Sequence, residues 1–290
     1  MKQMLSAERR SSILTFIKDL VVRTKDDDLA GLAAQLAYFF LLSLFPALFF
    51  IITLFGYLPI ETQDVLEFLR QYAPVDAMEL IETNVEKIVG EQNGGLLSFG
   101  LLATLWAASN AINAIMRAFN RAYDIKETRP FYITRGLAIV LTIGMVFVIM
   151  FALFIPVFGK VIGNAVLKVF GLSHNFLHVW SILRLLFSFL VILIIFSFLY
   201  KLAPNRKLKP MEVISGALFA TGGWITVSYL FAYYVDNFGN YSTTYGSIGG
   251  IIILMLWFYL TGWVVLLGGE INALLNCYRT SGKDSHYKKP

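Results

Sequence analysis

Apolar residues in this chain gather into long runs that are separated by shorter polar segments. Six runs are close to the length of about 20 residues that an α-helix needs to cross the hydrocarbon core of a bilayer. They cover about residues 36–58, 96–115, 136–158, 179–200, 213–234 and 248–275. The pattern predicts an all-α, polytopic membrane protein built as a bundle of six transmembrane helices.

Two of the six runs contain residues that interrupt their apolar character. Pro46 lies inside the first run. Because proline has no N–H and leaves the carbonyl of Leu42 without its helical donor, we expect a helix kink there. The second run is the least apolar of the six, and its polar residues are Ser98, Thr104, Ser109, Asn110 and Asn113.

The first polar segment predicts a helix of its own. Apolar residues recur at helical spacing between charged ones, which is typical of an amphipathic helix that lies along the membrane surface. They are Ile13, Phe16, Ile17, Leu20 and Val21. The acidic residues Asp26, Asp27 and Asp28 follow, and we expect them to supply the N-cap of the first spanning helix.

Charge sets the orientation of the predicted bundle. The chain is 57% hydrophobic and only 15% charged, against about a quarter charged in an average soluble domain. With six spans, 19 of the 24 Lys and Arg residues fall on one side. Because basic loops stay in the cytoplasm, both termini are predicted to be cytoplasmic. This asymmetry accounts for the net charge of +5 without a nucleic-acid partner.

The predicted parts of the chain are then three. Residues 1–28 form a cytoplasmic amphipathic segment, residues 29–276 the transmembrane domain, and residues 277–290 a basic cytoplasmic tail. The loop at 59–95 is too polar to cross and predicts two short amphipathic helices on the outer side. No cleavable signal peptide is predicted.

One candidate site lies toward the outer side. Arg184 falls inside the fourth run, and an ionisable residue within a span is a functional candidate because its burial in hydrocarbon is costly. Asp236, at the outer end of the fifth run, is its nearest predicted partner, and Tyr241 and Tyr245 follow it. These residues could form an outer polar pocket, or Arg184 could extend outward to the lipid headgroups.

A second candidate site lies toward the inner side, around Glu270 in the last run. Arg117, at the end of the second run, is predicted at the same depth, so an Arg117 to Glu270 ion pair would be its centre. The other polar residues near this depth are Gln35, Asn110, Asn113 and Asn272. Such an inner polar cluster could gate a pathway, take up a proton or hold helix ends together.

Other patterns predict little chemistry. His174 and His178 have the spacing of two metal ligands on one helix, but no nearby carboxylate or cysteine completes a site. No metal site, cofactor or enzyme active site is therefore predicted. The patterns Gly159-x-x-x-Gly163 and Gly246-x-x-x-Gly250 bear on helix packing only. Cys277 is the single cysteine, which excludes an internal disulfide.

Seven short strings stand out between about residues 30 and 276. They are Ala33-Ala34-Gln35-Leu36-Ala37-Tyr38, Leu41-Leu42-Ser43-Leu44-Phe45-Pro46, Leu105-Trp106-Ala107-Ala108-Ser109, Asn120-Arg121-Ala122-Tyr123, Pro204-Asn205-Arg206, Tyr245-Gly246-Ser247 and Leu267-Gly268-Gly269-Glu270-Ile271-Asn272. In this order they resemble the signatures of the YihY/BrkB family of bacterial membrane proteins. The resemblance implies a six-helix protein of the bacterial plasma membrane.

The resemblance does not imply one activity. Some members of that family have an older ribonuclease BN label, and others are associated with serum resistance or discussed as transporters or exporters. Three scattered histidines and few acids outside the membrane offer no metal-dependent nuclease site, so the residues disfavour a ribonuclease.

The leading functional hypothesis is a permease or exporter that moves a small or amphiphilic solute, a lipid among the options, past the two polar sites. The alternative is a non-transporting membrane scaffold or envelope-integrity protein, in which the same residues lock helices together. Substrate, coupling ion, direction of transport and oligomeric state do not follow from the sequence.

Overall fold

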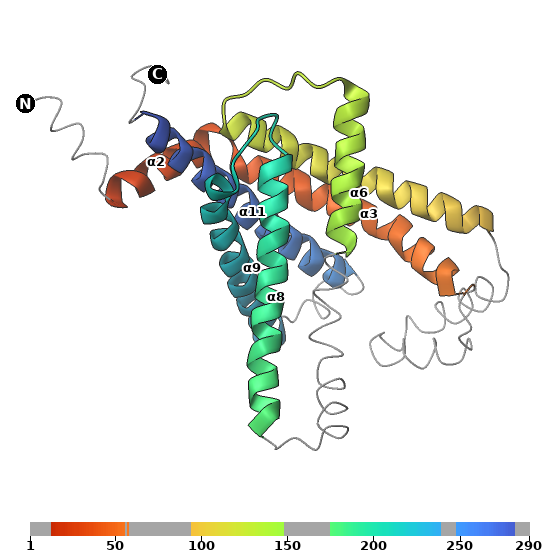
Figure 1. Cartoon of the computed structure of the whole chain (residues 1–290). Coiled ribbons are helices and arrows are strands. Elements are labelled where there is room, and N and C mark those ends of the chain that lie inside the picture. The colour runs from red at the N-terminus through yellow and green to blue at the C-terminus, as the bar shows by residue number, and fades with distance from the viewer. Residues whose placement is uncertain (1–12, 56, 58–93, 148–174, 239–247, 282–290) are drawn as a thin grey trace, which may run out of the picture. The chain divides into compact units, whose positions relative to one another are not determined.

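The structure is a computed structural model that describes residues 13–55, 57, 94–147, 175–238 and 248–281 (Figure 1). In these residues the regular elements are helices, and no strand occurs among them. They are α2 (Ile13–Asp26), α3 (Leu29–Phe55), α6 (Gly94–Ala122), a helix over Phe131–Phe147, α8 (Asn175–Leu202), α9 (Pro210–Phe238) and α11 (Gly249–Ser281). The predicted all-α class is confirmed.

Five of the helices contain segments long and apolar enough to cross a membrane. These segments are Leu29–Ile51, Gly94–Ala122, Leu185–Leu202, Pro210–Val235 and Gly249–Thr280. They overlap five of the predicted runs, including the polar second one, although the first segment lies seven residues earlier than the run at 36–58. The third run begins in the shorter helix Phe131–Phe147, and the rest of it lies outside the described residues, as does the loop at 59–95. The chain is a multi-pass membrane protein, and the count of six spans stays a prediction.

The chain forms two compact units, residues 39–110 and residues 1–38 with 111–290. In the first of these, α3 and α6 approach closely at one point, where a Cβ on Gly100 would lie 3.1 Å from the backbone of Phe50. Pro46 lies inside α3, which is continuous from Leu29 to Phe55. The kink expected at Pro46 stays a prediction.

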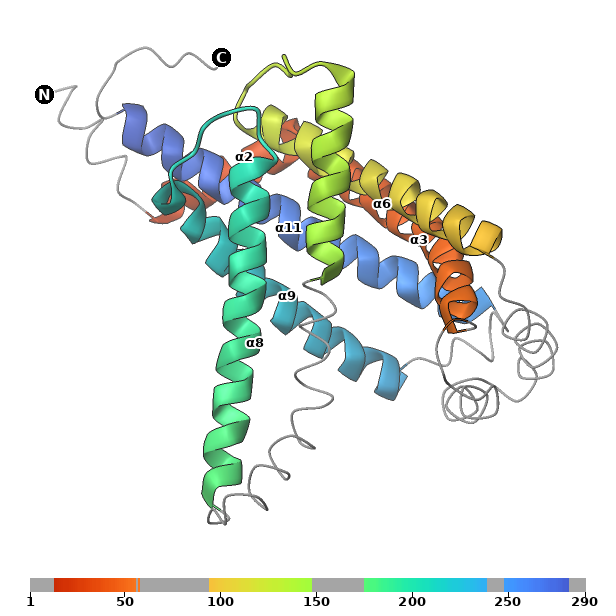
Figure 2. The ribbon, with the colours of Figure 1, turned by 45° about the vertical axis from the view of Figure 1, so that its right-hand side comes forward.

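In the larger unit, α9 packs along α11, and both views of the ribbon show the two helices side by side (Figures 1 and 2). Their backbones meet at two glycines. A Cβ on Gly216 would lie 2.0 Å from the carbonyl oxygen of Gly268, and a Cβ on Gly268 would lie 2.2 Å from Tyr200 Oη. Only glycine permits this approach, which we call the Gly216–Gly268 contact.

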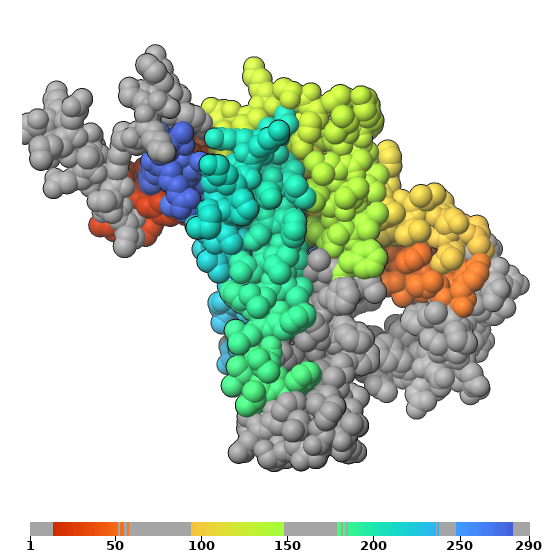
Figure 3. Space-filling view, viewed as in Figure 1, coloured from red at the N-terminus to blue at the C-terminus, as the bar shows by residue number. Residues whose placement is uncertain are grey.

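The helix α8 packs on α9 and is tied to α11 by Tyr200. The Tyr200 side chain is buried, and its hydroxyl donates to the carbonyl of Val265 at 2.7 Å. The outward surface of α8 is apolar and exposed, with Leu185 74% exposed, and α8 runs along the visible face of this unit (Figure 3). An exposed apolar surface of this kind suits contact with lipid.

A short turn joins α2 to α3. Asp28 adopts a left-handed backbone conformation with φ of 51°, which aspartate tolerates better than most residues. Its Oδ1 accepts a hydrogen bond from the N–H of Gly31 at 3.3 Å. The N-cap predicted among Asp26, Asp27 and Asp28 is therefore confirmed at Asp28. Within the larger unit, α2 packs against the last turns of α11.

Candidate functional site

Glu270 lies in the last spanning helix and is 2% exposed. Its Oε2 accepts a hydrogen bond from Arg23 Nε at 2.9 Å, and Arg23 Nη2 also donates to the carbonyl of Ala122. A buried carboxylate is costly unless a cation and hydrogen bonds compensate for lost water. The amphipathic helix α2 thus supplies the counter-ion of a buried acid in α11.

The charge state of Arg23 is fixed by its neighbours. Burial alone would lower the pKa of the Arg23 guanidinium, but the negative charges of Glu270 and Asp27 outweigh that effect and raise it. Arg23 therefore remains a cation throughout the accessible pH range.

Asp27, directly after α2, makes a second ion pair, in which it supplies the acid and α6 supplies the cation. Its side chain is buried, and its Oδ1 accepts from Arg121 Nε of α6 at 3.1 Å. Arg121 also donates from Nη2 to the carbonyl of Asp26 at 2.6 Å. We call the two pairs, Arg23–Glu270 and Asp27–Arg121, the α2 latch.

Two further contacts hold α2 against α11. The hydroxyl of Tyr278 donates to Asp19 Oδ2 at 2.5 Å, and the rings of Tyr278 and Phe16 meet edge to face with centroids 6.1 Å apart. Phe16, Asp19 and Arg23 therefore lie on the side of α2 that faces α11. The exposed residues Leu14, Ile17 and Val21 form an apolar stripe on the other side of the helix.

Two buried oxygen atoms beside the latch make no hydrogen bond within the described part of the chain, Asp27 Oδ2 and Tyr123 Oη. Burial raises the pKa of the Tyr123 phenol far above its ordinary value. Smaller electrostatic effects on this phenol come from four charged residues nearby, which are Arg206, Glu212, Glu270 and Arg23. The phenol stays protonated and can donate. The cluster thus keeps one donor and one acceptor that its own side chains do not use.

The ion pair predicted at the centre of the inner cluster was wrong, because Glu270 has a different basic partner. Glu270 pairs with Arg23, and Arg117 is exposed. Hydropathy predicts a similar depth for Arg117, but the helix that reaches Glu270 is α2, which is not among the candidate spanning segments. Gln35 is exposed as well, and Asn110 belongs to the unit of residues 39–110. Asn113 is half-buried, with an Oδ1 that finds no partner among the described residues.

Asn272 has a structural place in the molecule. Its Oδ1 accepts from the N–H of Gly216 at 2.6 Å, and its Nδ2 donates to the carbonyl of Val213 at 3.1 Å. Its side chain is fully buried. Both polar atoms are used to fix α11 on α9, beside the Gly216–Gly268 contact.

The outer polar pocket stays a prediction. Arg184 lies in α8 and Asp236 in α9, but the placement of their side chains is not described, and Tyr241 and Tyr245 lie outside the described residues. His174 also lies outside them. Across the described ranges, no group of three or more His, Cys, Asp or Glu side chains could hold a metal ion.

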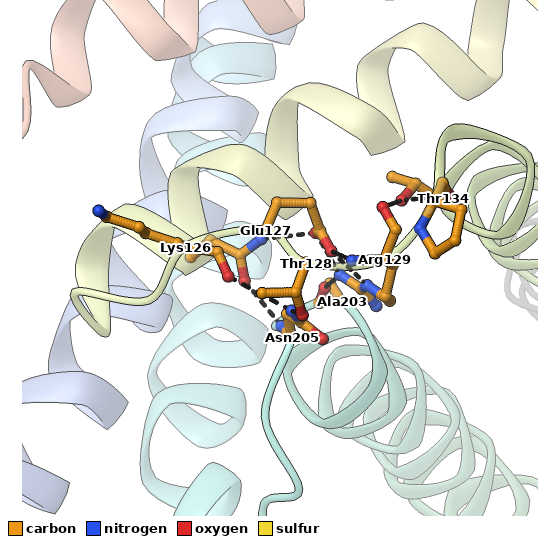
Figure 4. A network of polar contacts seen from close by, with 9 residues as sticks. Lys126, Glu127, Thr128, Arg129, Thr134, Ala203 and Asn205 are labelled. Atoms are coloured by element: carbon orange, nitrogen blue, oxygen red, sulfur yellow. Dashed lines mark hydrogen bonds and ion pairs between the residues drawn. The ribbon is translucent and has the colours of Figure 1, made fainter.

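A second polar network joins the loops that follow α6 and α8 (Figure 4). The helix α6 ends because Asp124 turns left-handed, with φ of 55°, and the N–H of Ile125 bonds back to the carbonyl of Asn120 at 2.8 Å. The Asn120 side chain then accepts from the N–H of Asn205 at 2.7 Å and donates to Glu127 Oε2 at 2.8 Å. We call Asn120, Glu127, Arg129 and Asn205 together the loop junction.

Glu127 and Arg129 form the charged part of the loop junction. Arg129 donates to Glu127 from Nε at 2.8 Å and from Nη2 at 2.7 Å, and Nη2 also reaches the carbonyl of Ala203 at 3.0 Å. The Arg129 hydrogen bonds lower the pKa of Glu127 to about 2.

The depressed pKa of Glu127 predicts an acid-sensitive loop junction. A carboxylate whose folded pKa lies below its unfolded value contributes stability above the unfolded pKa and loses it as pH falls toward the folded pKa. We expect thermal unfolding of the purified protein to lose stability between about pH 4.5 and pH 2. The variant Glu127→Gln should flatten part of this loss, by less than about 1 kcal/mol because the pair is partly exposed. An unchanged pH profile in the variant would contradict the role of Glu127.

Three of the strings singled out in the sequence converge in these contacts. Asn120-Arg121-Ala122-Tyr123 contributes to both the latch and the loop junction, Pro204-Asn205-Arg206 to the loop junction, and Leu267-Gly268-Gly269-Glu270-Ile271-Asn272 to the latch and to the α9–α11 packing. Sequence strings far apart in the chain therefore describe one end of one unit.

Comparison with known proteins covers almost the whole chain. The sequence model of the family described as virulence factor BrkB matches residues 20–290. The chain is 54% identical to a putative ribonuclease-like protein YfkH of Bacillus subtilis over 91% of this chain and 96% of that protein. It is 28% identical to a UPF0761 membrane protein of Cronobacter sakazakii, over 94% of this chain and 92% of that protein. No solved structure matches the chain.

Proposed function

The chain belongs to the virulence factor BrkB family, and on that premise we propose that it is a permease-like transporter of a small or amphiphilic solute. The proposal places it in the bacterial plasma membrane, with both termini in the cytoplasm. The α2 latch would be its inner gate. The ribonuclease-like name belongs to the Bacillus subtilis relative, and no group of His, Cys, Asp and Glu side chains in the described ranges suits a metal-dependent nuclease.

The observation that supports a gate is the origin of the cation that neutralises Glu270. If the acid served only to bind spans together, a partner on another span would do so permanently. Here the partner is Arg23, on a short helix that lies outside the spanning segments. A counter-ion on a peripheral helix can be withdrawn while the spans stay packed.

Opening of this gate would follow from the ion pairs. When α2 moves away, Arg23 leaves Glu270 and Asp27 leaves Arg121, so an acid of α11 and a cation of α6 become available together. The freed Glu270 would attract a cation, a proton or the basic part of a solute. The exposed stripe of Leu14, Ile17 and Val21 would keep α2 at the membrane surface during this movement.

Transport by purified protein in liposomes tests this proposal. Counterflow of metabolite classes and movement of fluorescent lipid analogues should reveal at least one solute class. Because Glu270→Gln removes the acid that the gate exposes, we expect its transport rate to change by about tenfold or more. The control is Lys18→Gln on the exposed side of α2, which should transport normally. Absence of movement for every class under any gradient would contradict the proposal.

A scaffold without transport is the second candidate, and the bonds of Asn272 and Tyr200 favour it because they tie α8, α9 and α11 firmly together. Cys277 separates the two candidates, since it is the single cysteine and lies near Arg23. A gate predicts that reaction of Cys277 with a membrane-impermeant thiol reagent changes rate when solute is added. A scaffold predicts one constant rate.

A further inference from the structure

A pocket of about 510 Å³ lies at the loop between α8 and α9. Its lining residues are Lys201, Leu202, Pro204, Asn205, Arg206, Lys207 and Leu208. Three of these are basic and none is acidic. We propose that this pocket binds the phosphate-bearing headgroup of an anionic phospholipid.

The expected level of the pocket in the membrane suits a lipid headgroup. The candidate spanning segment of α8 ends at Leu202 and that of α9 begins at Pro210, so we expect the loop between them, and the pocket in it, at the level of the lipid headgroups. Leu202 is 41% exposed, whereas Leu208 and Pro204 are buried. Basic and apolar groups therefore meet in one cavity, which suits an amphiphile better than a free anion.

The three cations of the pocket are available to a ligand. In the part of the chain that the structure describes, no ion pair engages Lys201, Arg206 or Lys207. Of the acids in the neighbouring loops, Glu127 binds Arg129, and Glu212 accepts a hydrogen bond from the backbone N–H of Lys209 at 2.8 Å. The positive-inside rule explains basic loops in general. It does not explain why three cations that make no ion pair with the described residues line one pocket.

The loop that forms the pocket is held in place by the loop junction. Asn205 donates from its backbone N–H to Asn120, and from Nδ2 to Thr128 Oγ1 at 2.8 Å and to the carbonyl of Lys126 at 3.3 Å (Figure 4). These bonds fix the residue that immediately precedes Arg206 and Lys207. A site whose backbone is ordered beforehand loses less entropy when a ligand binds.

The inference goes beyond the transport proposal and does not depend on it, because a lipid could occupy this pocket in a transporter or in a scaffold. Binding is the measurement that tests it, and transport is not. The full-length protein in nanodiscs of phosphatidylcholine, titrated with phosphatidylglycerol, provides the system. Short-chain phosphatidylglycerol, short-chain phosphatidylcholine and inorganic phosphate are the soluble probes.

We expect phosphatidylglycerol to bind saturably and about tenfold or more tightly than phosphatidylcholine. The triple variant Lys201→Gln, Arg206→Gln and Lys207→Gln should lose about a hundredfold in affinity, and each exposed single change, Arg206→Gln or Lys207→Gln, about fivefold. The control removes the same charge from exposed side chains outside the pocket. It is Lys18→Gln, Lys25→Gln and Lys126→Gln, and it should stay within about twofold.

The outcomes decide between the ligands. Equal binding of both lipids, or an equal loss in the control variant, would overturn the proposal by leaving only general surface attraction. Inorganic phosphate that binds as tightly as the lipid would overturn the lipid as ligand and assign the pocket to free phosphate. The single variants keep the test valid if the triple variant does not fold.

Discussion

Replacing Gly216 with alanine is expected to disrupt the packing of α9 on α11. The added methyl group would lie 2.0 Å from the carbonyl oxygen of Gly268 and 2.4 Å from Asn272 Nδ2. A backbone carbonyl cannot turn aside as the end of a side chain can, so the helices must separate. We expect a loss of about 3 kcal/mol or more, or failure to accumulate in the membrane. Thermal unfolding of the purified protein measures it.

The same helix provides a matched control. A Cβ on Gly222 would meet nothing within 4 Å, so Gly222→Ala adds the same methyl group in open space. It should leave stability unchanged or raise it by up to about 1 kcal/mol, because alanine favours the helix. If the two variants unfold at the same temperature, the Gly216–Gly268 contact does not determine the packing of this unit.

Replacing Arg23 with glutamine should release α2 while the spans remain packed. Glu270 would be left buried without its cation, which costs about 3 to 5 kcal/mol. Because α2 is a short helix outside the spanning segments, this cost is relieved by local opening. We expect the backbone amides of α2 to exchange hydrogen at least about a hundredfold faster, with a smaller change in global unfolding. Hydrogen exchange read by mass spectrometry resolves the segment.

A second variant separates the ion pair from general damage to α2. In the double variant Arg23→Gln and Glu270→Gln the buried charge of Glu270 is removed together with that of its cation, so much of the protection of α2 should return. The control Lys25→Gln changes an exposed cation on the same helix and should exchange as the unchanged protein does. A double variant as open as Arg23→Gln alone would show that Glu270 is not the reason α2 docks.

Much of the fold follows from the sequence because hydropathy records which segments must avoid water. Five predicted spans and the cap at Asp28 depend on such local signals. Hydropathy predicts the depth of a residue in the membrane but not which residues contact it. Arg117 was therefore predicted as the partner of Glu270, and Arg23 was predicted on a helix at the membrane surface. The spacing of Arg23 and Asp27, four residues apart with opposite charges, was the available signal that one face of α2 points inward.

The packing glycines show the same limit. Patterns with four-residue spacing directed attention to Gly246 and Gly250, but Gly250 has open space around it, and Gly246 lies outside the described residues. The glycines that do meet, Gly216 and Gly268, lie on different helices and form no local pattern. Close approach between two helices depends on which helices pair, and the spacing of glycines along one helix does not reveal its partner.

The number of residues in the turn at Asp28 is itself a requirement of the candidate site. Only Asp27 and Asp28 separate α2 from α3, and each residue in a helix rotates the next by about 100°. One extra residue in this turn would rotate and shift α2 as a whole against the start of α3, so that Arg23 would no longer point at Glu270, with every side chain of the latch still present. A relative therefore needs the same orientation of α2 against the start of α3, as well as the same residues, to form the latch.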